Sequence, residues 1–346
     1  MKNIAYIELD THAELATNFI ELTRDSQYLH VEYFFSQKIL DRINEKGSHV
    51  IHAEASTLLK ELDGRKFDAV IIGTAHRYFN VFEEVARNYP TFIIAHNLNF
   101  IKAPKSDIFR SIFKQDRSFR IKLWLKEGLM KKDKLYSEAK SLFILDENID
   151  ELQYPYELKW LPLLYTKQLD QKNVLSNRVV IPGNVDQRRR NYKRIFNKIK
   201  YFRGEFTFSF LGKAEGKELD KLKRLSQSLP GHVNIEYHDS RVSNEEFEQK
   251  MQAAEVLWCP IQKETKFFSI PEIYGKTKMS GNIGDAIKYA KPAIFPKSYS
   301  ASYSFIFKEK RDIEKQISEI KNKHYDFDSF EINLVRRKLE YLLSNL

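Results

Sequence analysis

Short apolar runs rich in β-branched residues recur along the chain, and a segment with helical periodicity follows most of them. The clearest are FDAVII at 67–72, TFIIA at 91–95, RVVI at 178–181 and FTFSFL at 206–211. Apolar runs of this length that alternate with helical patterns predict a parallel sheet with helical crossovers. We therefore expect an α/β fold built from doubly wound sheets.

The alternation occurs twice, separated by a polar stretch at 166–177 that we interpret as a linker. We predict strands before it at 4–9, 29–35, 49–52, 67–72, 91–95, 142–145 and 161–165, and after it at 178–181, 206–211, 233–237, 256–258 and 293–295. We predict helices at 13–22, 38–43, 56–62, 81–87, 191–200, 217–228 and 244–254. A chain of 346 residues is long enough for two domains. The predicted units are a Rossmann-like domain over 1–165, a second one over 166–329 and a C-terminal helix over 330–346. Whether that helix packs back on the first domain is left open.

Several features indicate a cytoplasmic protein. Its single cysteine, Cys259, has no intramolecular partner for a disulfide, which fits a reducing compartment. The N-terminus runs directly into a strand pattern, so we expect no signal peptide. No apolar run approaches the roughly 20 residues that span a bilayer.

Residues 264–296 carry an unusual density of glycines and charges between two predicted strands. Gly281 and Gly284 precede a helical pattern that begins at Asp285, and Glu272, Lys276 and Lys278 lie in the same loop. Unpaired N–H groups at a helix start bind anions, so this loop is a candidate phosphate site. A solvated loop with a charged helix start is the alternative.

Other loops at the predicted strand ends carry similar features. Gly183 and Gly212-Lys213 follow two strands of the second domain, and the run Arg188–Arg190 follows Gly183 closely. A diphosphate requires such glycines and cations, although the arginines could also form a solvated helix start. The first domain places three histidines at strand ends, where ligands bind in doubly wound sheets: His12, His76 and His96.

The segment 106–134 is strongly basic and aromatic. Residues 101–140 hold twelve lysines and arginines against five aspartates and glutamates. A basic helix with aromatic anchors is typical of a surface that binds anionic lipid. A core-packing helix with a solvated basic face is the alternative, and a nucleic-acid face is a third. Because no recognised nucleic-acid module is visible, we expect no nucleic-acid partner.

Two stretches of the second domain resemble a known family. IPGNVDQRRRNYKRI at 181–195 resembles a glycine-containing loop followed by a basic residue, and EIYGKTKMSGNIGDAIKYAKPAIFP at 272–296 resembles a nucleotide-sugar loop. Both are similar to the bacterial family-4-like GT-B glycosyltransferases that make surface polysaccharides. Since residues 272–285 are longer than the equivalent stretch, we interpret 276–283 as a local insertion.

The resemblance implies a role for each matching residue. His96 would contact the sugar near the reacting carbon, Glu272 the donor sugar, Asp285 the nucleoside and Arg189 the diphosphate. With the other anion-binding loops, the candidate donor-binding residues are Gly183, Arg189, Arg190, Lys213, Lys278, Ser280, Gly281 and Asp285, and the candidate catalytic residues are His96 and Glu272. The family transfers with retention and without a metal, so no cofactor is expected.

The predicted function is transfer of a sugar from a nucleotide-diphosphate-sugar to a glycan or polyprenyl-linked acceptor, in surface polysaccharide synthesis. Residues 106–134 would attach the enzyme peripherally to the inner face of an anionic membrane. Two alternatives stay open: a sugar-nucleotide epimerase, and a non-catalytic two-lobed protein that binds nucleotide-sugars.

Overall fold

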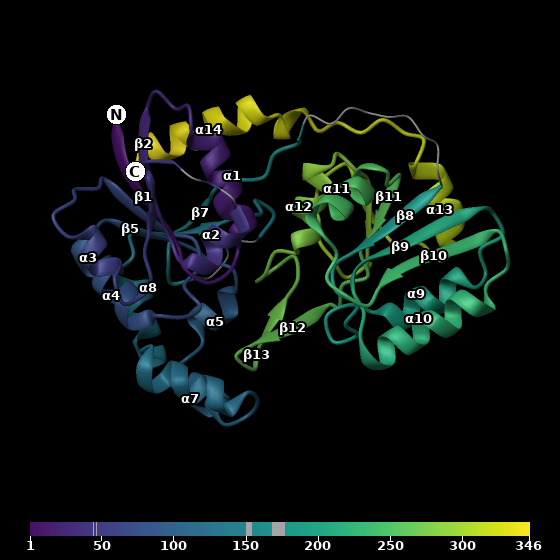
Figure 1. The fold of residues 1–346 in the computed structure, drawn as a ribbon, viewed down its shortest axis with the longest axis horizontal. Coiled ribbons are helices and arrows are strands. Elements are labelled where there is room, and N and C mark those ends of the chain that lie inside the picture. The colour runs from purple at the N-terminus through teal and green to yellow at the C-terminus, as the bar shows by residue number, and fades with distance from the viewer. Residues whose placement is uncertain (44, 46, 150–153, 168–176) are drawn as a thin grey trace.

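The computed structural model describes residues 1–43, 45, 47–149, 154–167 and 177–346, which form two α/β lobes side by side (Figure 1). Most of the predicted linker, 168–176, lies outside the described residues. Along the part of the chain that is described, no helix combines the length and the apolar character needed to cross a membrane.

The first lobe contains a seven-stranded parallel sheet in the order β3-β2-β1-β4-β5-β6-β7. Its strands are β1 (Lys2–Glu8), β2 (Leu29–Phe35), β3 (Val50–His52), β4 (Ala69–Ile72), β5 (Thr91–Ile94), β6 (Ser141–Ile144) and β7 (Leu158–Trp160). Its helices are α1 (Ala13–Thr23), α2 (Gln37–Ile43), α3 (Leu58–Leu62), α4 (Phe79–Asn88), α5 (Leu98–Lys102), α6 (Lys105–Ile112), α7 (Arg117–Lys126), the 3₁₀ helix η1 (Leu129–Lys131) and α8 (Lys132–Glu138).

Successive residues of each strand enter two different cores, because side chains alternate between the faces of a sheet. In β1, Ile4 and Tyr6 pack with α1, whereas Ala5 and Ile7 enter the opposite core with α4. Burial on both faces explains why these strands are almost continuously apolar in the sequence.

The second lobe contains a six-stranded parallel sheet in the order β10-β9-β8-β11-β14-β15. Its strands are β8 (Arg178–Pro182), β9 (Phe206–Lys213), β10 (Val233–His238), β11 (Val256–Trp258), β14 (Ala293–Phe295) and β15 (Ile306–Lys308). Its helices are α9 (Tyr192–Ile199), α10 (Gly216–Ser228), α11 (Asn244–Gln252), α12 (Gly281–Lys288) and α13 (Ile313–Ile320), followed by the 3₁₀ helix η2 (Asp328–Phe330).

The last helix, α14 (Ile332–Ser344), packs on the first lobe beside α1, although it follows the second lobe in the chain (Figure 1). Its buried side chains Val335, Leu339 and Leu343 belong to the same core as α1. Glu331 caps its N-terminus by accepting hydrogen bonds from the N–H groups of Asn333 and Leu334, at 2.9 and 3.0 Å. The chain therefore crosses between the lobes near residues 166 and 330, where the N–H of Thr166 donates to the carbonyl of Phe330 at 2.8 Å.

Two predicted elements are wrong. The segment 106–134 is not one helix, since Asp116 adopts a left-handed conformation (φ 49°) that separates α6 from α7. Residues 161–165 are not a strand; the sheet ends with β7 at Trp160, and Pro162 has no N–H for a strand ladder.

Several elements were not predicted, among them α5 and β7 of the first lobe and three features of the second. β15 and α13 complete the second lobe, and residues 264–273 form an antiparallel hairpin of β12 (Glu264–Phe267) and β13 (Ile270–Ile273) instead of a loop. Figure 1 shows the hairpin extending from the second lobe toward α5 of the first. It thus lies between the two lobes.

Candidate functional site

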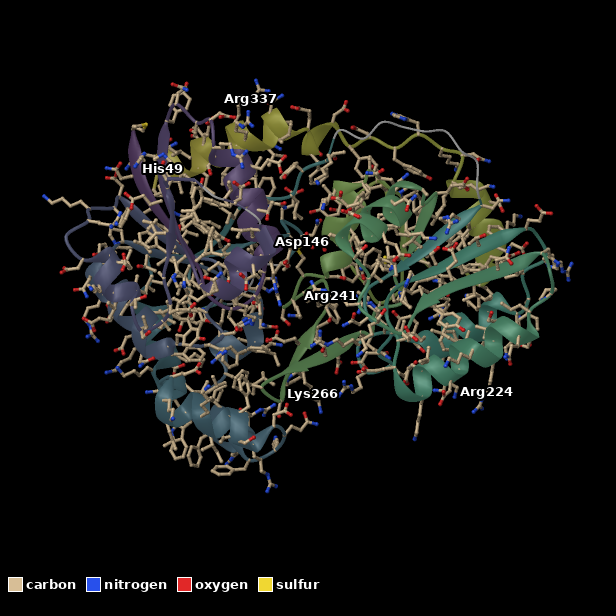
Figure 2. All side chains as sticks on the ribbon, viewed as in Figure 1. His49, Asp146, Arg224, Arg241, Lys266 and Arg337 are labelled. Atoms are coloured by element: carbon tan, nitrogen blue, oxygen red, sulfur yellow. The ribbon has the colours of Figure 1, made fainter. Side chains whose placement is uncertain are left out.

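A cleft of about 1060 Å³ lies between the two lobes, at the carboxyl ends of strands from both sheets. The first lobe lines it with α1, α2 and the residues that follow β1 and β5. The second lobe contributes the ends of β8 and β9, the loop after β10 and the start of α12. Figure 2 shows Arg241, from the loop after β10, between the two lobes. Ligands bind at this edge of doubly wound sheets, so the cleft is the candidate site.

Positive side chains outnumber negative ones in the cleft. Eight lysines and arginines line it against five aspartates and glutamates. A cleft with this balance attracts anionic ligands. The eight cations are Arg42, Lys167, Arg189, Arg190, Lys213, Arg241, Lys278 and Lys288.

Two glycines lie where the loop after β8 meets the end of β9. Gly183 has a φ of +97°, a conformation that favours glycine, and a Cβ there would collide with the guanidinium of Arg190. A Cβ on Gly212 would lie 2.5 Å from the carbonyl carbon of Gly183. Tyr192 fixes the first loop, since its hydroxyl donates to the carbonyls of Gly183 and Asn184 at 3.0 and 3.1 Å. The close approach of the backbone therefore requires glycine at 212, whereas at 183 the positive φ favours glycine and the Arg190 side chain occupies the space of a Cβ.

The three consecutive arginines separate into two environments. Arg188 is exposed and paired with Asp186 (Nη2–Oδ2 3.0 Å), outside the cleft lining. Arg189 and Arg190 line the cleft, and the buried Nε of Arg190 has no hydrogen-bond partner among the described residues. The arginines do not start a helix as predicted, because α9 begins at Tyr192 with Asn191 as its N-cap.

The start of α12 faces the cleft with Ser280 and Gly281. Ser280 is the N-cap, and its side-chain oxygen accepts a hydrogen bond from the N–H of Asn282 at 3.3 Å. The helix begins four residues earlier than predicted, so Asp285 lies within it. Burial raises the pKa of the Asp285 carboxyl, while a hydrogen bond from the Asn282 amide (3.0 Å) and the charge of Arg190 oppose the rise.

The predicted insertion at 276–283 has an ordinary structural role. It supplies the turn that follows β13 and the first residues of α12. Within it, Lys278 lies between the lobes, and its Nζ donates to Oδ1 of Asn97 at 2.7 Å. The Asn97 amide nitrogen in turn lies 3.0 Å from Nε2 of His76, which makes that ring nitrogen the acceptor. Burial lowers the pKa of Lys278 to about 8, although Glu272 opposes the decrease.

His96 follows β5 and lines the cleft as a neutral ring. Its Nε2 lies 2.8 Å from the carbonyl of Gly73, which can only accept, so Nε2 carries the hydrogen and Nδ1 is an acceptor. Burial lowers the pKa of His96 well below 6.5, and the charges of His12 and His76 add to the decrease. His96 therefore suits a hydrogen bond from a ligand hydroxyl to Nδ1.

His12 stacks directly on His96, with ring centroids 4.1 Å apart and planes inclined by 12°. It has a left-handed backbone (φ 48°), which is uncommon for a residue other than glycine and often marks a functional site. Its Nδ1 lies 2.8 Å from Oε1 of Glu14, which also lines the cleft. Among the residues described here, no group of three or more His, Cys, Asp or Glu side chains is arranged to hold a metal ion.

Glu272 lies outside the cleft lining. Its fully buried carboxylate accepts hydrogen bonds from the N–H groups of Asn99 (3.2 Å) and Phe100 (2.7 Å) and from the hydroxyl of Thr277 (2.6 Å). This position is inconsistent with the contact between Glu272 and the donor sugar that the resemblance implied. The other nine candidate residues all line the cleft: His96, Gly183, Arg189, Arg190, Lys213, Lys278, Ser280, Gly281 and Asp285.

Three residues near the site were not among the candidates. His12 had a detectable signal, because it follows the first predicted strand. Glu14 lies two residues later in the first turn of α1, and Asn97 is adjacent to His96. From the sequence, His12 was placed at a strand end without a role, and Glu14 and Asn97 were not selected, because their roles depend on contacts across the site.

Two parallel Rossmann-like sheets whose carboxyl ends face one cleft define the GT-B class of fold, which confirms the fold class predicted from the sequence. No protein-family model matches the sequence, and no curated protein matches it. Solved structures match over the whole chain, as follows.

Anabaena HepE, solved with UDP and glucose, aligns over 100% of both chains with a TM-score of 0.57 and 10% identity. The lipopolysaccharide outer core galactosyltransferase WaaB aligns over 99% of both chains with a TM-score of 0.57 and 11% identity. The UDP-GlcNAc 2-epimerase of Neisseria meningitidis, solved with UDP-GlcNAc, aligns over 99% of this chain and 100% of its own, with a TM-score of 0.56 and 11% identity. The chain therefore resembles GT-B glycosyltransferases, as its motifs predicted, and at these identities the likeness is one of fold.

Proposed function

We propose that this protein is a glycosyltransferase that transfers a sugar from a nucleotide-diphosphate-sugar to a glycan or lipid-linked acceptor in surface polysaccharide synthesis. One observation carries the proposal: Arg189, Arg190 and the start of α12 line one side of a cleft that has the neutral His96 on the other lobe. The first side suits a diphosphate and the second a sugar hydroxyl. HepE and WaaB, with the same fold, support this class of substrate.

The arrangement suits departure of a nucleoside diphosphate. The bond between the anomeric carbon and the diphosphate oxygen breaks, and its electron pair leaves with the phosphate. The acceptor oxygen forms the new bond to that carbon, and its hydroxyl proton passes to the departing phosphate oxygen. Positive groups fixed near the leaving oxygen stabilise the charge that develops there, an effect worth several kcal/mol. Here Arg189, Arg190 and the helix start at Gly281 would supply it.

Donor binding tests the diphosphate site. Calorimetry with UDP-, GDP- and ADP-sugars identifies the donor, and Arg190→Gln should then weaken its binding by roughly 10- to 100-fold, as expected for a charge-assisted hydrogen bond. Arg188→Gln is the matched control, since Arg188 is exposed and paired with Asp186. Equal affinities for the two variants would contradict the assignment.

Turnover tests the reaction. Incubating the identified donor with glycan or polyprenyl-linked acceptors should release the nucleoside diphosphate and form a glycosidic bond. From the resemblance to family-4-like enzymes we further propose that transfer retains the anomeric configuration of the donor sugar. NMR of the product tests this, because it measures the anomeric configuration. An inverted product would refute retention and leave the transfer reaction intact.

An epimerase is the second candidate function, favoured by the fold similarity to the UDP-GlcNAc 2-epimerase and by the three histidines at the first-lobe strand ends. An epimerase interconverts a nucleotide-sugar without an acceptor. Incubation in D₂O with no acceptor therefore distinguishes the two functions, because a 2-epimerase exchanges the hydrogen at the epimerised carbon. Binding without any turnover would instead favour the non-catalytic alternative.

We further propose that the first lobe docks on an anionic membrane near a lipid-linked acceptor. Four of the nine exposed large hydrophobic side chains among the described residues lie within 105–126: Phe109, Phe113, Phe119 and Leu125. The same segment also exposes Arg110, Lys114, Arg117, Lys122 and Lys126. We call these exposed side chains of 105–126 the basic aromatic face. Its cations suit acidic lipid headgroups, and its rings suit the interface below them.

Vesicle co-sedimentation tests this face. Binding should be stronger to vesicles that contain phosphatidylglycerol than to pure phosphatidylcholine, and salt should weaken it. The combined variant Phe109→Ser, Phe113→Ser and Leu125→Ser should lose the binding. The control is Tyr201→Ser, which removes a more exposed aromatic ring from the second lobe. Retained binding by the triple variant would refute the proposal.

A further inference from the structure

The β12–β13 hairpin belongs to the second lobe by sequence and to the first by packing. Phe268 at its tip is buried in the first-lobe core, with Phe267 against it. Both rings contact Phe100, with centroids 4.9 and 5.2 Å apart, and Phe267 lies 4.4 Å from the ring of His76. The hairpin therefore docks the second lobe on the strand-end region of the first.

The tip of the hairpin holds a conformation that docking helps to maintain. Phe268 and Ser269 both have left-handed backbones, with φ of 50° and 61°, at a cost of about 1–2 kcal/mol for each. First-lobe groups hold both residues. Arg120 donates a hydrogen bond from Nη1 to the Ser269 hydroxyl at 2.8 Å, and its guanidinium lies 5.3 Å from the centre of the Phe268 ring.

Glu272, on the returning strand, binds the first lobe through its carboxylate. The N–H groups of Asn99 and Phe100 belong to the first turn of α5, where no partner exists within the helix. Glu272 satisfies both from the other lobe and also accepts the hydroxyl of Thr277. The carbonyl of Thr277 accepts the N–H of Leu98 at 2.9 Å. The start of α5 is therefore capped by the second lobe.

The capped segment continues directly into the donor side of the cleft. Lys278 follows Thr277 and bonds Asn97, which bonds His76, and the cleft lining continues with Ser280 and Gly281. A change in the Glu272 contact would thus move residues 278–281 relative to the histidines of the first lobe.

We infer that the hairpin is an interlobe tie and that Glu272 is a positioning residue. Its carboxylate holds residues 277–281 at a set distance from His76 and His96. The consequence for catalysis rests on the proposed glycosyl transfer, whereas the tie itself does not. This role differs from contact with the donor sugar, because Glu272 acts through the backbone of α5 and through Thr277.

Distance measurements between the lobes test the tie without any substrate. Spin labels at Tyr28→Cys and Tyr201→Cys report on one lobe each, since both side chains are exposed and the native Cys259 is buried. Glu272→Gln should broaden the distance distribution toward longer separations. Glu264→Gln is the matched control, because Glu264 is an exposed glutamate on the same hairpin.

A milder variant guards against loss of folding. Thr277→Val removes one hydrogen bond to Glu272 and keeps the carboxylate, so it should broaden the distribution less than Glu272→Gln does. If Glu272→Gln does not fold, broadening in Thr277→Val alone supports the tie. Distributions as narrow as that of the unmodified protein in every folded variant would overturn it.

Kinetics test the consequence for catalysis. Misplacement of residues 278–281 should lower kcat by about 10- to 100-fold in Glu272→Gln. The donor KM should rise by a smaller factor than kcat falls, because Arg189 and Arg190 still bind the diphosphate from another loop while Lys278, Ser280 and Gly281 are displaced. A rise in KM with unchanged kcat would instead indicate direct donor contact and refute the positioning role. If no donor is turned over at all, the proposed function fails while the distance measurements still decide the tie.

Discussion

Replacing Glu8 with glutamine should change how the stability of the protein depends on pH. Glu8 ends β1, and its fully buried carboxylate accepts hydrogen bonds from the Thr74 hydroxyl at 2.6 Å and from the N–H groups of Asp10 and Thr11 at 3.1 and 3.2 Å. Burial raises the pKa of Glu8 from 4.5 to about 7, and these hydrogen bonds offset only part of the rise.

The sign and size of the effect follow from proton linkage. Between pH 4.5 and about 7 the folded protein keeps a proton on Glu8 that the unfolded chain releases. The stabilisation from Glu8 is therefore complete below pH 4.5 and is lost as the pH rises through about 7. A rise of about 2.5 in pKa, at about 1.4 kcal/mol for each pH unit, gives a loss on the order of 3 kcal/mol. Glutamine does not titrate and removes this dependence.

Thermal unfolding of both proteins between about pH 5 and about pH 8 measures the effect. Relative to the unmodified protein, Glu8→Gln should gain stability as the pH rises, by roughly 6–12 °C in Tm over the whole range for a lobe of this size. The control is Glu138→Gln, which replaces an exposed glutamate of the same lobe. Its Tm should depend on pH in the same way as that of the unmodified protein. A Tm difference between Glu8→Gln and the unmodified protein that stays constant with pH would refute the reasoning.

Three further outcomes are expected. Because the pKa of Lys278 is about 8, the affinity for the nucleoside diphosphate, measured by calorimetry, should fall as the pH rises through that value. Lys278→Arg should keep this affinity to higher pH. An affinity of the unmodified protein that does not change with pH would contradict the prediction. Gly183→Ala should lower the free energy of unfolding in urea by about 1–2 kcal/mol because of its positive φ. Gly281→Ala, where a Cβ meets no atom within 4 Å, should cost nothing, and equal losses would refute the argument. Leu339→Ala should lower the free energy of unfolding by about 2–5 kcal/mol, whereas Tyr341→Ala, at an exposed position of the same helix, should not. An unchanged stability of Leu339→Ala would show that α14 is not part of the first-lobe core.

Local patterns sufficed to predict most of the fold. Alternating apolar runs and helical periodicity indicated two parallel sheets, because strands buried on both faces must be continuously apolar. The same patterns located much of the cleft. Strands that run parallel bring their carboxyl ends to one edge, so His96 and Gly183 could be assigned to that edge from their place after a strand. The sequence also identified Arg189 and Arg190 as candidates. It did not reveal that the adjacent Arg188 pairs with Asp186 and lies outside the cleft lining.

The position of Glu272 required the tertiary structure. Its sequence neighbours predicted a loop in the donor site, yet its carboxylate caps α5, more than 170 residues away in the chain. Likewise, the pattern of 264–273 contains no turn glycine, and its hairpin is held at Phe268 by a pocket of the other lobe. Propensity and spacing describe what a segment can form by itself. Which partner satisfies a buried carboxylate, or supports a left-handed turn, depends on surfaces that come together only when both lobes have folded.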